Sequence, residues 1–387
     1  MMMIDRSLNP SRERSFFLFG ARGTGKTTFL RSWFEGEDVL WIDLLDPVVE
    51  DRYARRPGLL SEQINAGTIA DGWVVVDEVQ KVPRLLDVVH AEIERSGTRF
   101  ALTGSSARKL KRGSTNLLAG RAFVNHLFPM TAAELGGTFD LQSALEFGTM
   151  PGQLDLEAEV DKAEFLRAYA LTYLKEEIWA EHLVRNLDPF RAFLEVAAQC
   201  DGEIVNATRI ARDVGVDPKT VQSYFQILED TLLAHILEPF NRSVRKRQSK
   251  SPRFYFMDNG VSRALSRTLN VPLNRGTYAY GRAFERFLIA EAFRRCAYLK
   301  NDYRLSYLRT KDGAEIDLIV ERPGLSIALV EIKSATEVDE TDLRHLKAFR
   351  AAIPESEAIC LSQEALPRVV DGIQILPWRD GMKKLGM

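Results

Sequence analysis

A phosphate-binding motif near the N-terminus constrains the fold of this chain more than any other feature. Residues 15–20 read SFFLFG, a short apolar run that ends in glycine, and the next fourteen residues, ARGTGKTTFLRSWF, have helical character. Gly20 is followed by four residues and then by Gly25, Lys26 and Thr27, which matches G-x-x-x-x-G-K-[ST]. The motif lies between a predicted strand and a predicted helix, as a P-loop requires, and it predicts an α/β fold.

The residue types of this loop fit the binding of ATP with Mg²⁺. Glycines let backbone amides curl around the phosphates, and the N-terminus of the following helix adds a partial positive charge. The Lys26 ammonium would reach the β- and γ-phosphates, and the Thr27 hydroxyl would ligate the magnesium ion. We therefore expect ATP and Mg²⁺ as cofactors. The residues expected to bind them are Gly20, Ala21, Arg22, Gly23, Thr24, Gly25, Lys26, Thr27, Thr28 and Asp77.

An acidic pair follows a second apolar run. Residues 72–80 read GWVVVDEVQ, in which an apolar run suits a central parallel strand and Asp77 and Glu78 stand at its carboxyl end. Ligands bind at that edge in open α/β sheets. Asp77 would hold the magnesium ion, directly or through water, and Glu78 would polarise the water that attacks the γ-phosphate. Adjacent carboxylates at a strand end can also form a solvated turn, but their place after a P-loop favours the catalytic role.

Two further segments complete a predicted doubly wound sheet. Residues 39–47 (VLWIDLLDP) and 98–110 (TRFALTGSSARKL) each contain a strand-like apolar run. In the second segment Thr103, Ser105 and Ser106 supply hydroxyls at the end of the strand, where a polar side chain can sense the γ-phosphate. The alternation of strands and helices predicts a parallel sheet.

These motifs resemble those of the AAA+ ATPases, specifically the prokaryotic medium-sized group whose chains end in a nuclease-like domain. The segments that carry the resemblance are GARGTGKT, WVVVDEVQ, LTGSSARKL and LLAGR. The resemblance implies a sensor at Ser105 or Ser106 and an arginine finger, donated by a neighbouring subunit, at Arg121 or Arg108. It also implies a homo-oligomer. By residue type alone, either arginine can equally be a solvated surface charge.

The sequence after the P-loop domain reads as helical. Residues 131–137 (TAAELGG) resemble a helix start, and residues 163–183 show apolar residues at spacings of three and four. We expect residues 133–195 to form the helical lid of the ATPase. Four residues of this segment fit a core-packing helix with a solvated acidic face better than a separate site: Tyr173, Leu174, Glu176 and Glu177.

A helix-turn-helix is predicted within residues 196–250. In TRIARDVGVDPKTVQSYFQIL a turn around Gly215 separates two helices, and Asp217 and Pro218 suit the N-cap and first turn of the second. The segment resembles a winged helix, a module that contacts DNA in many proteins and serves only for packing in others. A basic run follows, which either attracts phosphates or forms a solvated loop. Its cations are Arg242, Arg245, Lys246, Arg247, Lys250 and Arg253.

The last third predicts a helix and three strands that carry a group of charged residues. The helix contains Glu285, and the strands carry Asp317 and then, fourteen positions later, Glu331, with Lys333 two residues beyond it. Glu331 and Lys333 face the same side of a strand because side chains alternate along it. Two carboxylates could hold Mg²⁺ while the lysine orients or deprotonates water, as in metal-assisted phosphodiester hydrolysis. Glu285 could supplement them.

This set resembles the PD-(D/E)xK nuclease superfamily. Ile316 stands where that family's proline would precede the aspartate. An exposed salt-bridged hairpin would give the same letters, and a nuclease fold that has lost cleavage could keep DNA binding. The predicted architecture is an α/β P-loop parallel sheet in residues 1–132, a helical lid in 133–195, a winged helix in 196–250 and a restriction-endonuclease-like α/β domain in 251–387.

The overall composition limits the classes of function that the chain can have. Fifty-two basic residues stand against 54 acidic ones, so any surface for DNA must be a local patch. Three distant cysteines without a CxxC pair indicate free thiols in a reducing cytoplasm, and no apolar run approaches the ~18 residues of a membrane span. Two hypotheses remain: a cytoplasmic, DNA-linked ATPase, and a nucleotide-switched protein-interaction module with an inactive nuclease fold.

Overall fold

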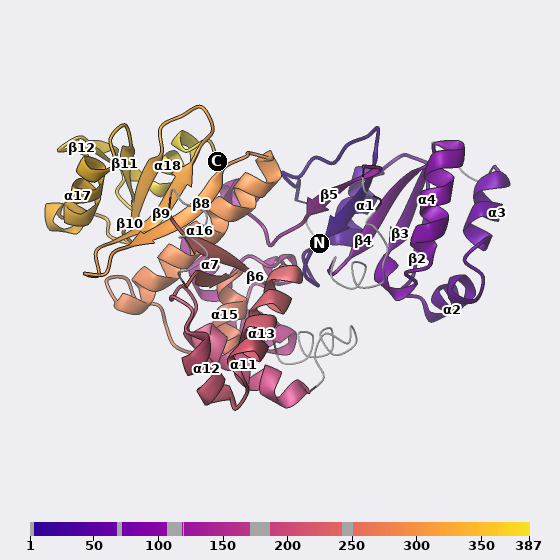
Figure 1. Cartoon of the computed structure of the whole chain (residues 1–387), viewed down its shortest axis with the longest axis horizontal. Coiled ribbons are helices and arrows are strands. Elements are labelled where there is room, and N and C mark those ends of the chain that lie inside the picture. The colour runs from indigo at the N-terminus through magenta and orange to yellow at the C-terminus, as the bar shows by residue number, and fades with distance from the viewer. Residues whose placement is uncertain (1–3, 68–71, 107–117, 119, 171–185, 242–250) are drawn as a thin grey trace. The chain divides into compact units, whose positions relative to one another are not determined.

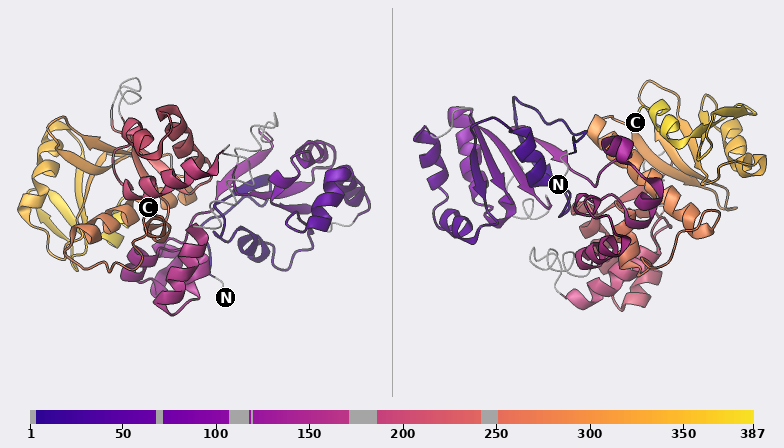
Figure 2. Two further views of the ribbon diagram at one scale, coloured as in Figure 1. Left: turned by 90° about the horizontal axis from the view of Figure 1, so that it is seen from below. Right: turned by 180° about the vertical axis from the view of Figure 1, so that it is seen from behind.

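The computed structural model describes the chain except residues 1–3, 68–71, 107–117, 119, 171–185 and 242–250. It divides into two compact units, which Figure 1 and Figure 2 show from three sides. The N-terminal unit comprises residues up to 130 together with 230–233, and the C-terminal unit comprises 131–229 and 234–387. Within the described residues no helix is long and apolar enough to cross a membrane. The boundaries of the four domains expected from the sequence remain predictions.

A five-stranded sheet forms the centre of the N-terminal unit. Its strands are β1 (Ser15–Phe19), β2 (Leu40–Asp43), β3 (Trp73–Asp77), β4 (Arg99–Gly104) and β5 (Ala122–His126). They run in the order β2-β3-β4-β1-β5, and all neighbours pair in parallel. Every residue of β1 and β3 is buried, as expected for central strands covered on both faces. The segments that leave β1, β3 and β4 therefore begin at one edge of the sheet.

Helices accompany this sheet and complete its core. They are α1 (Lys26–Trp33), α2 (Pro47–Arg55), α3 (Leu59–Asn65), the 3₁₀ turn η1 (Val79–Lys81) and α4 (Leu85–Ser96). In Figure 1, α1 and α4 run alongside the strands. The core joins Phe17, Val76 and Leu102 of three strands to Leu86 and Val89 of α4. The N-terminal unit is thus an α/β layer structure around a parallel sheet, consistent with a P-loop domain.

A group of helices opens the C-terminal unit. They are α6 (Ala132–Leu135), the 3₁₀ turn η2 (Gly136–Thr138), α7 (Leu141–Phe147), α8 (Pro151–Leu154), α9 (Glu159–Ala168), α11 (Leu187–Gln199), α12 (Ala207–Val214), α13 (Pro218–Asp230) and α15 (Asn259–Leu265). Thr131 starts α6 with a capping box that includes Glu134. Tyr224 of α13 packs edge-on against Phe190 of α11, with ring centroids 5.0 Å apart. The residues 173–177 singled out in the sequence lie outside the described residues.

A mixed sheet of eight strands follows. Its strands are β6 (Ala234–Pro239), β7 (Arg253–Phe256), β8 (Arg304–Arg309), β9 (Glu315–Glu321), β10 (Ala328–Ile332), β11 (Glu357–Ser362), β12 (Arg368–Val370) and β13 (Ile373–Pro377). The order is β12-β13-β11-β10-β9-β8-β6-β7. The antiparallel pairing of β8 with β9 and of β9 with β10 corresponds to the three strands expected from the sequence.

Helices pack on both faces of this sheet. They are α16 (Tyr278–Leu299), the 3₁₀ turn η4 (Glu340–Leu343), α17 (Arg344–Ala352) and α18 (Trp378–Lys384). Val330 of β10 belongs to a core with Phe284 of α16, whereas its neighbour Leu329 belongs to a second core with Leu346 of α17. Because neighbouring side chains of a strand point to opposite faces, these two cores lie on opposite sides of the sheet.

Candidate active site

The loop between β1 and α1 places the predicted phosphate-binding residues. Gly25 caps α1 with a φ of 88°, a left-handed conformation that a glycine adopts without steric cost, and Lys26 begins the helix. Thr24 is fully buried and its hydroxyl donates to the Ala21 carbonyl at 2.8 Å, whereas Arg22 is exposed. The backbone amides at the start of α1 are thereby presented at the edge of the sheet where β1 ends.

Asp77 lies between two hydroxyl groups. The Thr27 hydroxyl donates to Asp77 Oδ2 at 2.7 Å, and the Thr103 hydroxyl of β4 donates to Asp77 Oδ1. Asp77 itself is 1% exposed. The structure therefore brings the P-loop threonine and the strand-end aspartate together, although they are fifty residues apart in sequence. Thr103 was expected as one of several strand-end hydroxyls, and its bond to Asp77 was not.

Glu78 lies beside the P-loop lysine. Its Oε1 is 3.7 Å from Lys26 Nζ, which also donates to the Gly20 carbonyl at 2.8 Å. The Glu78 backbone is left-handed, with φ 60° and ψ 48°, and its N–H donates to the Thr103 hydroxyl at 2.9 Å. A non-glycine residue in this region is held there by its surroundings. The Thr103 contact is one such constraint.

The predicted sensor and finger residues occupy different surroundings. Ser105 and Ser106 follow β4 and are buried, and the Ser105 hydroxyl accepts a hydrogen bond from Gln80 at 3.3 Å. Arg121, just before β5, forms an ion pair through its Nε with Glu94 of α4. Hydrogen bonding and charge from Arg121 hold the pKa of Glu94 below its usual range. Arg108 lies outside the described residues.

Two residues contact this site without having been singled out in the sequence. The Arg6 guanidinium donates to the Thr24 carbonyl at 3.0 Å and to the Phe128 carbonyl at 2.5 Å. Gln80 donates from its amide to Glu78 Oε2 as well as to Ser105. No spacing rule in the sequence pointed to Arg6, which lies before β1, but Gln80 stands inside the quoted DEVQ segment.

The donor set fits a magnesium nucleotide. Magnesium in P-loop proteins takes one or two protein oxygens and several from phosphates and water. Thr27 and Asp77 offer a hydroxyl and a carboxylate 2.7 Å apart, and Lys26, which precedes Thr27 in sequence, supplies a cation. Among the described residues, no three His, Cys, Asp or Glu side chains gather around one metal position. A site that relies on substrate oxygens does not need such a group.

The residues expected to form a nuclease-like site also come together, in the C-terminal unit. Glu331 Oε1 pairs with Lys333 Nζ at 2.9 Å, and Asp317 Oδ2 accepts from the Ile332 N–H at 2.8 Å. Burial, followed by the charge of Glu331, raises the pKa of Asp317 well above its usual range. Burial raises the pKa of Glu331 as well, against the lowering effect of Lys333. The predicted carboxylates and lysine therefore form one electrostatically coupled cluster.

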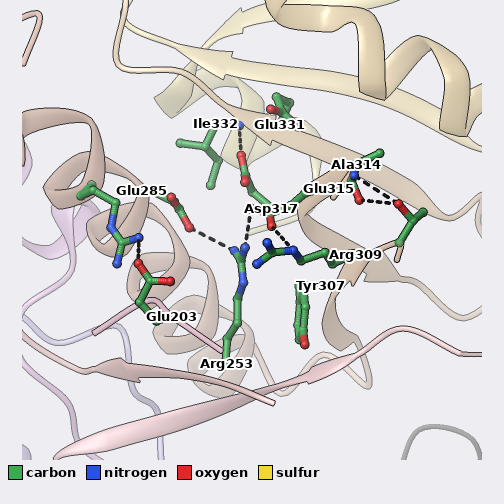
Figure 3. Close-up of polar contacts among 12 residues, drawn as sticks. Glu203, Arg253, Glu285, Tyr307, Arg309, Ala314, Glu315, Asp317, Glu331 and Ile332 are labelled. Atoms are coloured by element: carbon green, nitrogen blue, oxygen red, sulfur yellow. Dashed lines mark hydrogen bonds and ion pairs between the residues drawn. The ribbon is translucent and has the colours of Figure 1, made fainter. Parts of the chain in front are cut away.

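An arginine lies inside this cluster. Figure 3 shows the Arg253 side chain among Glu285, Glu315 and Asp317. Arg253 Nη1 is 3.3 Å from Glu285 Oε1, and Nη2 forms an ion pair with Glu315. Its guanidinium also lies over the Tyr307 ring, 4.9 Å from the centroid. Arg253 is 5% exposed, so this last cation of the basic run is not available to a phosphate on the surface.

The helix-turn-helix segment places a polar helix face at the surface. Gly215, with a φ of 76°, ends α12, and the Asp217 carboxylate accepts from the backbone of Lys219 and Thr220 at the start of α13. Buried residues of α13 include Val221, Phe225 and Leu228. Four polar residues of α13 are exposed instead: Lys219, Gln222, Ser223 and Gln226. Residues 242–250 of the basic run lie outside the described residues.

Known proteins match the chain in three consecutive segments. Residues 12–136 match a family model described as an AAA domain. The N-terminal unit carries an AAA domain. Residues 138–271 match a domain of unknown function, DUF8612, and residues 280–380 match another, DUF4143. The AAA domain is thus followed by a C-terminal domain that similar proteins share.

Similar proteins extend over most of the chain. An uncharacterized protein of Mycobacterium tuberculosis is 27% identical over 343 residues, which cover 87% of this chain and 75% of that protein. An uncharacterized protein of Methanocaldococcus jannaschii is 23% identical over 424 residues, which cover 97% and 86%. A solved signal-transduction ATPase with a tetratricopeptide repeat sensor, from Pyrococcus horikoshii, is 12% identical with a TM-score of 0.23. That match covers 74% of this chain and 47% of the solved one.

Proposed function

We propose that the AAA domain binds ATP with Mg²⁺ and hydrolyses it. The observation that carries this proposal is the 2.7 Å hydrogen bond from the Thr27 hydroxyl to Asp77, with Lys26 Nζ only 3.7 Å from Glu78 on the same sheet edge. An ammonium, a hydroxyl and two carboxylates in that arrangement are the groups that phosphoryl transfer to water uses. The assignment of the unit as an AAA-family ATPase domain rests on the family match alone.

Each residue has a role in this proposal. Lys26 binds the phosphate oxygens, and Thr27 and Asp77 hold the magnesium ion, which neutralises charge that develops on those oxygens. Glu78 orients the attacking water and accepts its proton. Ser105 donates to the γ-phosphate as a sensor. Lys26 must leave its contact with Glu78 to reach a phosphate, so nucleotide binding would free that carboxylate for water.

The test is phosphate release from ATP by the full chain. We expect release that requires Mg²⁺ and stops with EDTA. Asp77→Asn keeps the size of the side chain and one acceptor oxygen for the threonine hydroxyls while removing the charge. It should lower the rate by a factor on the order of 100, as loss of one electrostatic contact at a reaction centre does. Hydrolysis by Asp77→Asn at the parent rate would contradict the proposal.

We propose DNA as the partner of the C-terminal unit, bound through α13. The exposed face of α13 carries an ammonium, a hydroxyl and two amides, which are the groups that read base edges in the major groove. The second helix of a helix-turn-helix is the element that enters that groove. Gel shifts on duplex and junction DNA at low salt test the proposal, and absence of binding to both would contradict it. Stimulation of the ATPase by one DNA form would identify the substrate.

The cluster around Arg253 favours a nuclease-like fold that does not cleave DNA. Asp317 and Glu331 remain the residues proposed for a second Mg²⁺, with Lys333 and Glu285 beside them. However, Arg253 and Lys333 already neutralise carboxylates of this cluster. We therefore expect no DNA cleavage by the parent chain, even with Mn²⁺. Cleavage that is lost in Lys333→Ala would overturn this view and support an active nuclease.

A homo-oligomer completes the proposal. An arginine finger at Arg121 acts only when a second copy of the chain presents it to the nucleotide. The Arg121 ion pair with Glu94 would compete with that role and would have to open on assembly. Sedimentation with and without an ATP analogue tests this point, and a monomer under both conditions would remove the finger from the mechanism.

A further inference from the structure

Gln80 lies between Glu78 and Ser105. In the proposed hydrolysis these two residues act on either side of the γ-phosphate. It belongs to η1, directly after the acidic pair, and is 4% exposed. Its Nε2 donates to Glu78 Oε2 and, at 3.3 Å, to the Ser105 hydroxyl. One amide group therefore connects the end of β3 to the end of β4.

Close packing around Gln80 fixes the place of its amide. A Cβ atom on Gly104 would lie 2.7 Å from Gln80 Oε1, closer than a carbon can approach an oxygen without displacing it. Gly104 is the last residue of β4 and immediately precedes Ser105. The absence of a side chain at Gly104 thus leaves the space in which the Gln80 amide reaches the sensor.

Glu78 is held by three contacts of different kinds. Its backbone N–H bonds to Thr103, its Oε1 lies 3.7 Å from Lys26 Nζ, and its Oε2 accepts from Gln80. If Lys26 turns to a phosphate, its contact with Glu78 is lost. The Gln80 amide then still restrains Oε2, while Oε1 is released toward the attacking water.

We propose that Gln80 is a positioning residue that couples Glu78 to the sensor Ser105 during ATP hydrolysis. The inference rests on the proposed function of the AAA domain. When the Ser105 hydroxyl donates to a γ-phosphate oxygen, the hydroxyl is reoriented. The hydrogen bond that it accepts from the Gln80 amide changes as a result. Because the same Gln80 amide also donates to Glu78 Oε2, a shift of the amide changes the orientation of the Glu78 carboxylate. Binding of ATP needs neither step, so Gln80 acts on the rate of hydrolysis and not on affinity.

The experiment compares Gln80→Met with the parent chain. Methionine has nearly the length of glutamine but cannot donate a hydrogen bond. We expect kcat to fall by a factor on the order of 10 to 100, the range that a misplacement of about 1 Å can produce. The Kd of a fluorescent ATP analogue should stay within about twofold, because only an interaction of the transition state is lost. Gln63→Met, at an amide that accepts from Tyr53 in the same unit, is the matched control and should keep the parent rate.

A double-mutant cycle separates coupling from simple packing. If Gln80 and Ser105 act as one unit, Gln80→Met combined with Ser105→Ala should be no slower than about the slower single variant. Gln80→Ala serves as a second variant in case methionine disturbs folding. Independent multiplication of the two effects, a Kd that rises as much as kcat falls, or a parent-like rate in either Gln80 variant overturns the inference. A parent chain without hydrolysis that depends on Lys26 overturns the proposed function and the inference with it.

Discussion

The two units use the same kinds of charged group in opposite ways. In the AAA domain, the buried Asp77 is bonded by the Thr27 and Thr103 hydroxyls. In the C-terminal unit, Glu331 pairs with Lys333, and Arg253 pairs with Glu285 and Glu315. The first carboxylate accepts from neutral hydroxyl groups, whereas three carboxylates of the second group, Glu285, Glu315 and Glu331, pair with cations of the chain.

That difference decides what each site can accept. Hydroxyl donors leave the negative charge of Asp77 in place, so a cation such as Mg²⁺ still gains by approaching it. Cations of the chain itself remove most of that gain in the C-terminal cluster. Burial and then the charge of Glu331 raise the pKa of Asp317, so a metal ion has to compete there with a more tightly held proton than at an ordinary carboxyl group. This contrast favours the AAA site over the C-terminal cluster as the place where a cation would bind.

The largest effect should follow removal of the P-loop cation. Lys26→Ala should lower the rate of ATP hydrolysis by a factor on the order of 100 to 1,000, because a charge that stabilises the transferred phosphoryl group is lost. Phosphate release at saturating ATP measures it. Lys347→Ala is the control, since Lys347 is 63% exposed and pairs only with Asp371 at the surface in the described contacts. Similar rates for the two variants would break the assignment of the AAA site.

The next effect tests whether the C-terminal cluster closes on itself. Arg253→Met leaves Glu285 and Glu315 without their buried partner, which should reduce the free energy of unfolding by about 3 kcal/mol. Urea denaturation followed by circular dichroism measures the loss. Millimolar Mn²⁺ should then stabilise Arg253→Met and not the parent, because a divalent cation can replace the missing charge. If Mn²⁺ changed the stability of Arg253→Met and of the parent equally, Arg253 would not occupy a position that a divalent cation can take.

Arg309→Met provides the matched control for that variant. Arg309 contacts the same Glu315 through its Nε at 3.7 Å, but 46% of its side chain is exposed. An exposed ion pair of this kind contributes less than about 1 kcal/mol. A loss at Arg309 as large as the loss at Arg253 would mean that burial does not distinguish the two arginines.

Another buried carboxyl group of the C-terminal unit makes the stability of the chain depend on pH. Glu291 of α16 is fully buried, and its Oε1 accepts from the Ala132 N–H at 3.0 Å, while Oε2 has no partner among the described residues. Burial raises the pKa of Glu291 from 4.5 to about 7. Between these values the folded chain holds a proton that the unfolded chain has released. Stability of the parent therefore falls as pH rises through this window.

Glu291→Gln should remove that pH dependence. A neutral amide oxygen can still accept from Ala132, so the variant and the parent should be about equally stable near pH 5. At pH 8 the variant should be more stable by roughly 2.5 kcal/mol, since each unit of pKa shift corresponds to about 1.4 kcal/mol and most of the shift lies above pH 5. Urea unfolding of both proteins at the two pH values gives the difference, in which all other titrating groups cancel. A difference that does not change with pH would contradict the raised pKa.

Local patterns were sufficient to predict that the P-loop and the acidic pair lie close together. The P-loop has a fixed spacing, and the apolar run before Asp77 marks a strand whose carboxyl end lies at the same edge of a parallel sheet as the P-loop. The structure places the Thr27 hydroxyl 2.7 Å from Asp77 and the Lys26 ammonium 3.7 Å from Glu78. Three strands around Asp317 and Glu331 were likewise evident from alternation and turns. These features depend on short segments, so they can be predicted without knowledge of the fold.

The remaining contacts depend on neighbours that no spacing reveals. Arg253 closes a basic run, so its sequence context suggested a surface charge, yet it pairs with Glu285 and Glu315, 32 and 62 residues away. Gln80 stands two residues after Glu78, and only the left-handed backbone at Glu78 and the turn η1 bring its amide back to that carboxylate. Buried partners of charged groups are set by packing, and packing is a property of the whole unit.

The smallest effect concerns the proposed binding of DNA by α13. If the exposed face of α13 reads base edges, Gln222→Ala should weaken DNA binding about fivefold to tenfold, because one well-placed side-chain contact to a base contributes about 1 kcal/mol or more. Fluorescence anisotropy at fixed salt measures the Kd. Gln199→Ala, at an exposed glutamine that ends α11, is the matched control and should bind like the parent. Equal weakening by both variants would show that the effect is not specific to α13, and no weakening by Gln222→Ala would place the DNA contact elsewhere and favour a protein partner for the C-terminal unit.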